Sequence, residues 1–318
     1  MYDVIIIGGA AAGSTAGIYA ARRKMKTLIL TKDIGGQASI TPSVENYPGF
    51  LEVPGFELMQ RFQEQAIKSG AEIIFEEVVE IREKGRSFFV KTQTNEYEAK
   101  ALILTFGKTP RSLNVPGEKE FLGKGVSYCA TCDLPVFRDK TVAVVGGGNS
   151  ALDAALYGSE IARKLYLIHR RDKFRGFEYL VERVKEKDNV EFVLNSIVTE
   201  IKGEKFVKSI IVKNVLNNTE KEIDVDGIFI EIGYETKVDF VKDLVKLDEQ
   251  NQVMINKNCE TFYPNSDKIH PGIFAAGDLT DTPFKQIVIS AGEGAKAALQ
   301  AYNYIHCMKP VVADWSKG

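Results

Sequence analysis

The stretch from Val4 to Leu30, VIIIGGAAAGSTAGIYAARRKMKTLIL, aligns without a gap on the stretch from Val142 to Ile168, VAVVGGGNSALDAALYGSEIARKLYLI. Each copy has an apolar run, a glycine-rich turn, a stretch of small residues and a second apolar run. That order is typical of the βαβ unit that binds dinucleotides, in which the helix N-terminus receives the pyrophosphate. One such fingerprint is weak evidence, but two in the same register predict an α/β protein with two dinucleotide-binding modules.

The turn of the first copy departs from the full fingerprint. It reads Gly8-Gly9-Ala10-Ala11-Ala12-Gly13, with Ala10 in place of the glycine that lets backbone approach the pyrophosphate. Alanine adds only one methyl group, so a nucleotide site is preferred over a tight βα turn without a ligand. The second strand ends in Leu30-Thr31-Lys32 rather than in an acid, which leaves ribose recognition to the backbone or the following loop.

The turn of the second copy, Gly146-Gly147-Gly148-Asn149-Ser150-Ala151, fits the fingerprint in full. Asn149 and Ser150 at the helix start are candidates either to contact the pyrophosphate or to cap the helix. The strand that follows ends in the basic run His169 to Arg175, HRRDKFR, where guanidinium groups can grip a 2′-phosphate. This register favours NADPH over NADH, and the alternative is an ordinary solvated basic turn.

Between the two copies, Tyr128-Cys129-Ala130-Thr131-Cys132-Asp133 places two thiols at redox-pair spacing. Such a pair can close a small disulfide, and the neighbouring Asp133 is a candidate proton donor. A closed zinc site needs about four ligands, and the other cysteines, Cys259 and Cys307, stand alone far downstream. A redox-active pair without a metal is therefore predicted, and the two downstream cysteines are expected to pack as small apolar residues.

The bulk properties describe an ordinary globular protein. The length of 318 residues predicts about two domains, with 44% hydrophobic and 26% charged residues. A net charge of -2 and a pI near 6.1 give no electrostatic footprint for nucleic acid or an anionic membrane. The chain starts directly on an apolar strand-like run, without a basic leader or a membrane-length segment, so a cytoplasmic protein is expected.

The remaining pattern predicts one domain inserted in another. The runs Glu72 to Glu77 and Ser87 to Gln93 are expected as strands of a small meander, and Ala101 to Gly107 as a buried strand ending in a ligand-facing turn. Residues 114–241 are expected to form the inserted domain, which closes with the strand Gly227 to Gly233. The chain then returns with Gly272 to Asp278 and a helix from about Ile287 to Tyr304.

In these motifs the chain resembles the low-molecular-weight thioredoxin reductases over nearly its whole length. The resemblance rests on both fingerprints and on the runs Gly35-Gly36-Gln37, Val44-Glu45-Asn46-Tyr47-Pro48-Gly49, Cys129 to Asp133, His169 to Arg175, and Gly277-Asp278 followed by Gln286. It implies a homodimeric enzyme with two Rossmann-like domains of the three-layer ββα type. It further implies an FAD-binding domain of residues 1–113 and 242–318, with the NADPH-binding domain of residues 114–241 inserted in it.

The resemblance also implies a role for each site residue. NADPH would reduce FAD, FAD would reduce the disulfide, and the dithiol would reduce a thioredoxin-like protein. Cys132 would be the flavin-side thiol, Cys129 the one that attacks the substrate, and Asp133 the acid/base. The FAD-binding residues would be Gly8, Ala10, Ala12, Gly13, Thr31, Gly36, Gln37, Asn46, Gly107, Gly277, Asp278, Lys285, Gln286 and Ile287. The NADPH-binding residues would be Gly146, Gly148, Asn149, Ser150, His169, Arg170, Arg171, Arg175 and Gly233.

Two of these positions carry an alternative or a departure. Asp278 follows a glycine turn, where it can bond a ribityl or ribose hydroxyl or simply cap a helix. Lys285 stands where the family usually has arginine, and an ammonium group cannot reproduce a bidentate guanidinium contact. The resemblance further implies that the inserted domain turns about its two connections, so that nicotinamide and disulfide reach the flavin alternately.

Rival functions are separated by single features. Ferredoxin- or flavodoxin-linked NADP reductases lack the cysteine pair. A dithiol oxidase, or a reductase with a donor other than NADPH, needs no arginine clamp. Glutathione-reductase-type enzymes carry a wider-spaced pair in the first domain, and the region from Gly35 to Gly49 has no cysteine. A non-enzymatic NADP(H) redox sensor is the remote alternative from another class.

Overall fold

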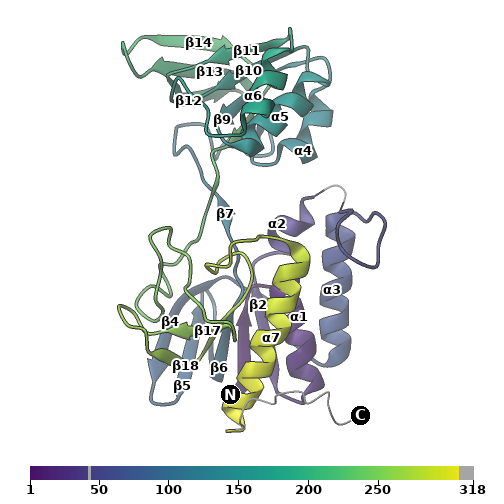
Figure 1. Cartoon of the computed structure of the whole chain (residues 1–318), viewed down its shortest axis with the longest axis vertical. Helices are drawn as coiled ribbons and strands as arrows, with labels where there is room; N and C mark the ends of the chain where they lie inside the picture. Colours follow the sequence, from purple (N-terminus) through teal and green to yellow (C-terminus); the bar gives the residue numbers. More distant parts are fainter. Residues whose placement is uncertain (42–43, 308–318) are drawn as a thin grey trace. The chain divides into compact units, whose positions relative to one another are not determined.

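The computed structural model describes residues 1–41 and 44–307, with Thr131 and Cys132 described by their backbone alone. The chain divides into two compact units (Figure 1). Unit 1 comprises residues 1–109 and the chain from residue 236 onward, and unit 2 comprises residues 110–235. Unit 2 is thus inserted in unit 1. From the sequence, the two changeovers are expected at 113/114 and 241/242.

A parallel sheet forms the centre of unit 1. Its strands lie in the order β18-β6-β1-β2-β3, and each neighbouring pair is parallel. The bounds are β1 (Tyr2–Ile7), β2 (Thr27–Thr31), β3 (Glu72–Phe75), β6 (Glu96–Leu104) and β18 (Ile269–Ala275), with β17 (Glu260–Phe262) antiparallel at the β18 edge. A strand that is covered on both faces has a continuous run of apolar residues, and β1 has such a run.

Helices cover one face of this sheet and a small antiparallel meander covers the other. In Figure 1, α1 (Ala11–Arg22), α3 (Gly55–Ser69) and α7 (Ile287–Ile305) lie side by side against the strands, and the short α2 (Gly36–Ser39) precedes α3. The meander consists of β4 (Val78–Lys84), β5 (Ser87–Thr92) and the start of β6. The prediction that Glu72 to Glu77 belongs to this meander is wrong, because Glu72–Phe75 pairs with β2 in the parallel sheet.

Alternation along the strands builds the two cores of unit 1. Val4 and Ile6 of β1 pack with alanines of α1 and α7, whereas Ile5 and Ile7 pack with the meander and with Val241. Successive side chains of a strand point to opposite faces, so one apolar run serves both layers. These layers fix the carboxyl ends of the strands, where α/β proteins bind their ligands.

Unit 2 repeats the design on a smaller scale. Its parallel sheet has the order β11-β10-β9-β15-β8. The bounds are β8 (Val126–Ser127), β9 (Thr141–Gly146), β10 (Lys164–Ile168), β11 (Val190–Val193) and β15 (Gly227–Glu231). One face carries α5 (Asn149–Ser159) and α6 (Glu178–Lys185), and the other carries the antiparallel strands β12 (Ser196–Gly203), β13 (Val207–Asn214) and β14 (Glu220–Asp224).

Two short features complete unit 2. The CxxC lies at α4 (Ala130–Asp133), which runs into the 3-10 helix η1 (Leu134–Phe137). The strands β7 (Thr109–Pro110) and β16 (Tyr234–Glu235) pair with each other where the chain crosses between the units. The α/β fold with two Rossmann-like three-layer units, one inserted in the other, is thereby confirmed.

Candidate active site

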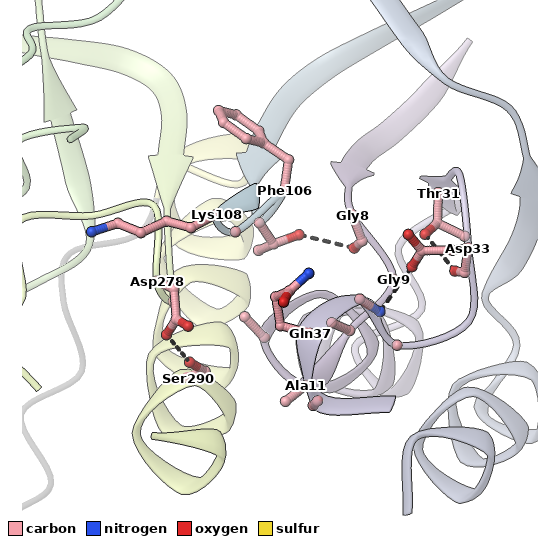
Figure 2. A pocket seen from close by; sticks show the side chains of 18 of the residues that line it. Gly8, Gly9, Ala11, Thr31, Asp33, Gln37, Phe106, Lys108, Asp278 and Ser290 are labelled. Carbon is pink, nitrogen blue, oxygen red and sulfur yellow. Dashed lines mark hydrogen bonds between the residues drawn. The ribbon is translucent and has the colours of Figure 1, made fainter. Parts of the chain in front are cut away.

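Unit 1 holds a cavity of about 670 Å³ at the carboxyl ends of β1, β2 and β6. Cofactor-sized ligands occupy cavities of a few hundred to about a thousand Å³. Of the residues expected to bind FAD, all except Gly13 line this cavity. Figure 2 shows Asp33 and Asp278 on opposite sides of it, with Gln37 between them. Segments far apart in the sequence thus meet at one site.

The start of α1 forms the floor of the cavity. Ala10, Ala11 and Ala12 line it, the first turn of the helix has no acidic residue, and no side chain caps it. The first backbone N–H groups of a helix have no partner within the helix and attract anions such as pyrophosphate. The methyl group of Ala10 leaves this helix start at the cavity wall, so the departure from glycine does not close the site.

Gly8 and Gly13 serve the backbone around this helix start. Gly8 has a φ of +110°, and a Cβ there would lie 2.3 Å from the Thr105 carbonyl oxygen. A Cβ on Gly13 would lie 1.8 Å from the carbonyl oxygen of Gly8. Gly13 therefore permits close packing of the helix on the turn, which explains why it does not line the cavity.

Asp33 is a cavity residue that the sequence reasoning missed. It lines the cavity and lies two positions beyond the end of β2. This is the loop that the sequence suggests for binding the ribose. The loop is ordered by two hydrogen bonds: Thr31 Oγ1 donates to the Asp33 carbonyl at 2.9 Å, and Gly36 N–H donates to Asp33 Oδ1 at 2.8 Å. The signal was an acid displaced slightly from the usual position at the strand end.

Polar side chains line the middle of the cavity. Gln37 Oε1 is buried and has no hydrogen-bond partner within residues 1–41 and 44–307. A buried polar atom without a partner is costly, and a bound ligand is one way to satisfy it. Nearby, Asn46 Nδ2 donates to Gln286 Oε1 at 3.1 Å, which joins two expected FAD-binding residues 240 positions apart.

The far side of the cavity is formed by Asp278 and two lysines. Asp278 Oδ1 accepts the Ser290 hydroxyl at 3.2 Å (Figure 2), and the N-cap of α7 is Gln286, so Asp278 does not cap that helix. Lys285 Nζ donates to the Thr280 carbonyl at 2.6 Å. Burial, followed by the charge of Lys108, lowers the pKa of Lys285. Lys108 was not expected at the site, yet it also lines the cavity.

The glycine turn of unit 2 presents one open position. Gly146 has a φ of +159°, and a Cβ there would lie 2.3 Å from the Glu231 carbonyl oxygen. A Cβ on Gly147 would lie 2.1 Å from His169 Cε1, whereas one on Gly148 meets nothing within 4 Å. Gly148 caps α5, whose first turn holds no acid. The turn is thus packed from behind and free at Gly148, where a pyrophosphate can approach.

The residues of the basic run separate into two roles. His169 is buried, stacks on Phe174 at a centroid distance of 5.1 Å, and contacts the Lys173 carbonyl through Nε2 at 3.1 Å. Burial lowers its pKa, which favours the neutral form of the ring. The geometry therefore gives His169 a supporting role under the glycine turn. The exposed guanidinium groups are those of Arg170, Arg171 and Arg175.

Arg175 is anchored to the glycine turn, because its N–H donates to the Gly147 carbonyl at 2.7 Å. Within the described part of the chain, no ion pair joins Arg170, Arg171 or Arg175 to a carboxylate. Asn149 uses Oδ1 to accept the Phe177 N–H at 2.8 Å, and Ser150 is exposed beside it. Three cations without a carboxylate partner thus lie around an open helix start.

The remaining residue expected to bind NADPH is Gly233, which lies where the chain passes from unit 2 back to unit 1. Its carbonyl accepts the Arg111 N–H at 2.9 Å.

The CxxC segment is tied together at Ser127. Cys129 is disulfide-bonded and half-buried, and the side chain of Cys132 lies outside what the structure describes. Ser127 Oγ accepts the Cys129 N–H at 3.0 Å and donates to Asp133 Oδ2 at 2.6 Å. The Asp133 N–H in turn reaches the Cys129 carbonyl at 3.2 Å. The carboxylate is therefore held at the same helical turn as the disulfide.

The other two cysteines differ from each other. Cys259 is 1% exposed, and burial raises the pKa of its thiol to about 12, as expected for a packed apolar residue. Cys307 is exposed, so the expectation that it also packs as a small apolar residue is wrong. It lies just beyond the end of α7. Among the helices of residues 1–41 and 44–307, none is both long and apolar enough to cross a bilayer.

Comparison with known proteins agrees with this site. The sequence profile of the family "Pyridine nucleotide-disulphide oxidoreductase" matches residues 2–295. A thioredoxin reductase from Peptoclostridium acidaminophilum is 39% identical over 313 residues, covering 96% of this chain and 97% of its own. The crystal structure of Lactococcus lactis thioredoxin reductase has a TM-score of 0.79 at 37% identity, covering 97% of this chain and 100% of its own.

A second similar structure is named for a different electron donor, ferredoxin. A ferredoxin-flavin thioredoxin reductase from Clostridium acetobutylicum has a TM-score of 0.52 at 33% identity, covering 96% of this chain and 98% of its own. The fold and site define a pyridine nucleotide-disulphide oxidoreductase. Within that class, the chain belongs to the low-molecular-weight thioredoxin reductases. The family implies FAD and NAD(P)H as cofactors and a thioredoxin as substrate.

The residues present fit these cofactors. The cavity of unit 1 offers an uncapped helix start, the unpartnered Gln37 oxygen and an acid at each side, as an elongated dinucleotide requires. The turn of unit 2 offers a second uncapped helix start at the open Gly148. Two separate nucleotide sites in one chain match a flavoenzyme that is reduced by a nicotinamide nucleotide.

Proposed function

We propose that this enzyme uses NADPH and one proton to convert the disulfide of a thioredoxin-like protein into two thiols, releasing NADP⁺. In this proposal FAD occupies the cavity of unit 1, NADPH occupies the turn of unit 2, and Cys129 with Cys132 forms the redox disulfide. The single observation that carries it is the CxxC segment on the unit whose glycine turn and basic run form a nucleotide site.

When bound, FAD accepts a hydride from NADPH and passes an electron pair to a disulfide. The start of α1 would hold the pyrophosphate, Asp33 would bind the adenosine ribose and Asp278 a ribityl hydroxyl, since all three line the cavity. Lys285 and Lys108 place positive charge on the Asp278 side of the cavity. Their charge favours anionic groups of the cofactor there, although Lys285 cannot form the bidentate contact of an arginine.

The cysteines divide the transfer to the protein substrate between them. Cys129, as a thiolate, attacks the substrate disulfide and forms a mixed disulfide, and one substrate sulfur leaves. Cys132 then attacks Cys129, which re-forms the enzyme disulfide and releases the second substrate thiol. Asp133 supplies protons to the leaving sulfurs, and its bond from Ser127 keeps the carboxylate beside Cys129. As the family resemblance implies, we propose that the inserted unit turns about its two connections, so that nicotinamide and disulfide reach the flavin alternately.

NADPH is the donor favoured by the basic run. Arg170, Arg171 and Arg175 are exposed and lack carboxylate partners in the described chain, and a 2′-phosphate is the ligand that such a cluster fits. A ferredoxin or another donor would leave this cluster without a role. We also infer a homodimer, as the family resemblance implies, and a cytoplasmic location, since a reducing compartment suits a catalytic CxxC. Light scattering of the purified enzyme measures the dimer.

Anaerobic titration tests the proposal. The purified protein is expected to be yellow, to bleach with NADPH, and to regain its colour when oxidised thioredoxin is added. C132S should keep flavin bleaching, lose thioredoxin reduction, and trap the substrate on Cys129 as a mixed disulfide. A flavin that stays oxidised with NADPH would overturn the donor assignment. Thioredoxin reduction that survives in C132S would overturn the assignment of the disulfide.

A further inference from the structure

Glu231 connects the two functional features of unit 2 and has no role in the proposed reaction so far. It is the last residue of β15 and lies opposite Gly146 in the β15–β9 pairing, directly behind the glycine turn. Its side chain contacts the CxxC segment, because Oε1 accepts the N–H of Ala130 at 3.3 Å. Ala130 directly follows Cys129. A carboxyl group is therefore held beside the redox segment from a different strand.

The surroundings of Glu231 leave its charge unbalanced. Glu231 is partly buried, and within the described residues no lysine, arginine or histidine forms an ion pair with it. Burial raises its pKa to about 7, and the Ala130 N–H opposes this rise. The carboxyl group thus changes its charge close to neutral pH, whereas an unperturbed glutamate has a pKa of 4.5.

The groups that face Glu231 from neighbouring elements are few. Strands β8 and β9 bring no titratable side chain, and α4 brings Asp133 and follows Cys129 at its N-cap. The β16 residue Tyr234 has a pKa raised by burial and then by the charge of Glu231. Other titratable groups on packed elements, Asp153 and Tyr157 of α5 and Lys208 and Lys213 of β13, do not contribute to the shift of Glu231.

We propose that the charge state of Glu231 controls thiolate formation at the Cys129/Cys132 dithiol, which makes it a positioning residue of the disulfide site. A carboxylate that accepts the N–H of Ala130, the residue after Cys129, adds negative charge beside the pair and repels a thiolate there. A protonated Glu231 removes that repulsion. The inference rests on the proposed redox role of the CxxC, but it concerns the thiols and not the cofactor or the substrate.

The test measures thiol reactivity against pH in the full-length protein. Exposed Cys307 is first replaced by serine, and buried Cys259 is left in place. The C307S protein is reduced with dithiothreitol, desalted without oxygen, and alkylated with iodoacetamide between pH 5 and 10. Peptide masses then assign the rates to Cys129 and Cys132. Neither NADPH nor thioredoxin is needed, so failure here and failure of the proposed reaction are distinguishable.

E231Q removes the charge and keeps an acceptor for the Ala130 N–H. We expect it to lower the apparent thiol pKa by about one unit, to raise the alkylation rate at pH 7.5 by about five-fold, and to abolish an inflection near pH 7. E231D should retain that inflection. E182Q, which removes an exposed charge from α6 of the same unit, should match the C307S parent.

Superimposed pH profiles of E231Q and its parent would overturn the proposal. Should E231Q fold poorly, as judged by circular dichroism, E231A provides a second removal of the same charge. A parent-like profile in folded E231A would likewise reject the role of Glu231. A faster rate in both charge-removing variants, with parent-like E231D, would establish it.

Discussion

Ser127 donates its hydroxyl to Asp133 Oδ2 at 2.6 Å and at the same time accepts the Cys129 N–H at 3.0 Å. One small side chain on β8 therefore orients both the backbone of the redox cysteine and the carboxylate that follows the CxxC. The hydroxyl donates its hydrogen bond to Asp133, so the carboxylate is held in a fixed position beside the backbone of Cys129. General acid/base groups act at hydrogen-bond range and in a fixed geometry.

D133N should separate the two halves of the reaction. Reduction of the flavin by NADPH should stay within about two-fold of the parent, while thioredoxin reduction falls by about a hundred-fold, the range of a lost general acid/base. Stopped-flow absorbance of the flavin and steady-state NADPH oxidation measure the two quantities. S127A keeps the carboxylate but loosens it, so a loss of about ten-fold is expected. Full turnover in D133N would show that Asp133 manages no proton.

The internal repeat made most of the fold predictable. Two copies in one register located β1, α1 and β2 in one unit and β9, α5 and β10 in the other, because a buried parallel strand and a glycine turn leave a strong local pattern. The strand Glu72–Phe75 was assigned to the wrong sheet. A four-residue strand carries little periodicity, and its pairing with β2 depends on the path of α3, which the local sequence does not encode.

The cavity residues were predictable where a motif marks them and unpredictable where only packing does. Fourteen residues were expected to bind FAD, and of these only Gly13 does not line the cavity. Gly13 packs against the Gly8 carbonyl instead, where a side chain would have no room. Lys108 was missed, since a lysine after a glycine turn has no signature. His169 belongs by register to a basic run, yet the Gly147 backbone packs on its ring.

The arginine cluster should set the nucleotide preference. Alanine at Arg170, Arg171 or Arg175 removes a charge that can contact the 2′-phosphate, so each change should raise the KM for NADPH by about ten-fold, equal to about 1.4 kcal/mol. The KM for NADH should stay the same, because NADH has no 2′-phosphate. R183A, at an exposed position of α6, is the matched control. Equal losses with both nucleotides would instead indicate a structural role for the cluster.

Two adjacent glycines should respond differently to alanine. G147A places a Cβ 2.1 Å from the His169 ring, so it should lower the Tm by several degrees. G148A adds a Cβ that meets nothing within 4 Å, at a φ of -95°, so its Tm should equal that of the parent. The same methyl group faces the approaching pyrophosphate, and NADPH binding should weaken by about ten-fold or more. Thermal denaturation and NADPH titration measure both effects. Unchanged NADPH affinity in G148A would place the pyrophosphate elsewhere.

Glu231 should also give the stability of unit 2 a pH dependence that runs opposite to that of a salt-bridged acid. Its pKa is raised to about 7 in the fold, from 4.5 in the unfolded chain, so the folded state holds the proton longer. Its contribution is most favourable below pH 4.5 and is lost as the pH rises through 7. E231Q should therefore match the parent at pH 4.5 and exceed it at pH 8 by about 2 kcal/mol, a discounted fraction of the full linkage. Denaturant unfolding at the two pH values measures the difference, with E182Q as the control for an exposed charge. A gain of equal size at both pH values would mean that glutamine packs better than glutamate, and that burial of the charge is not the cause.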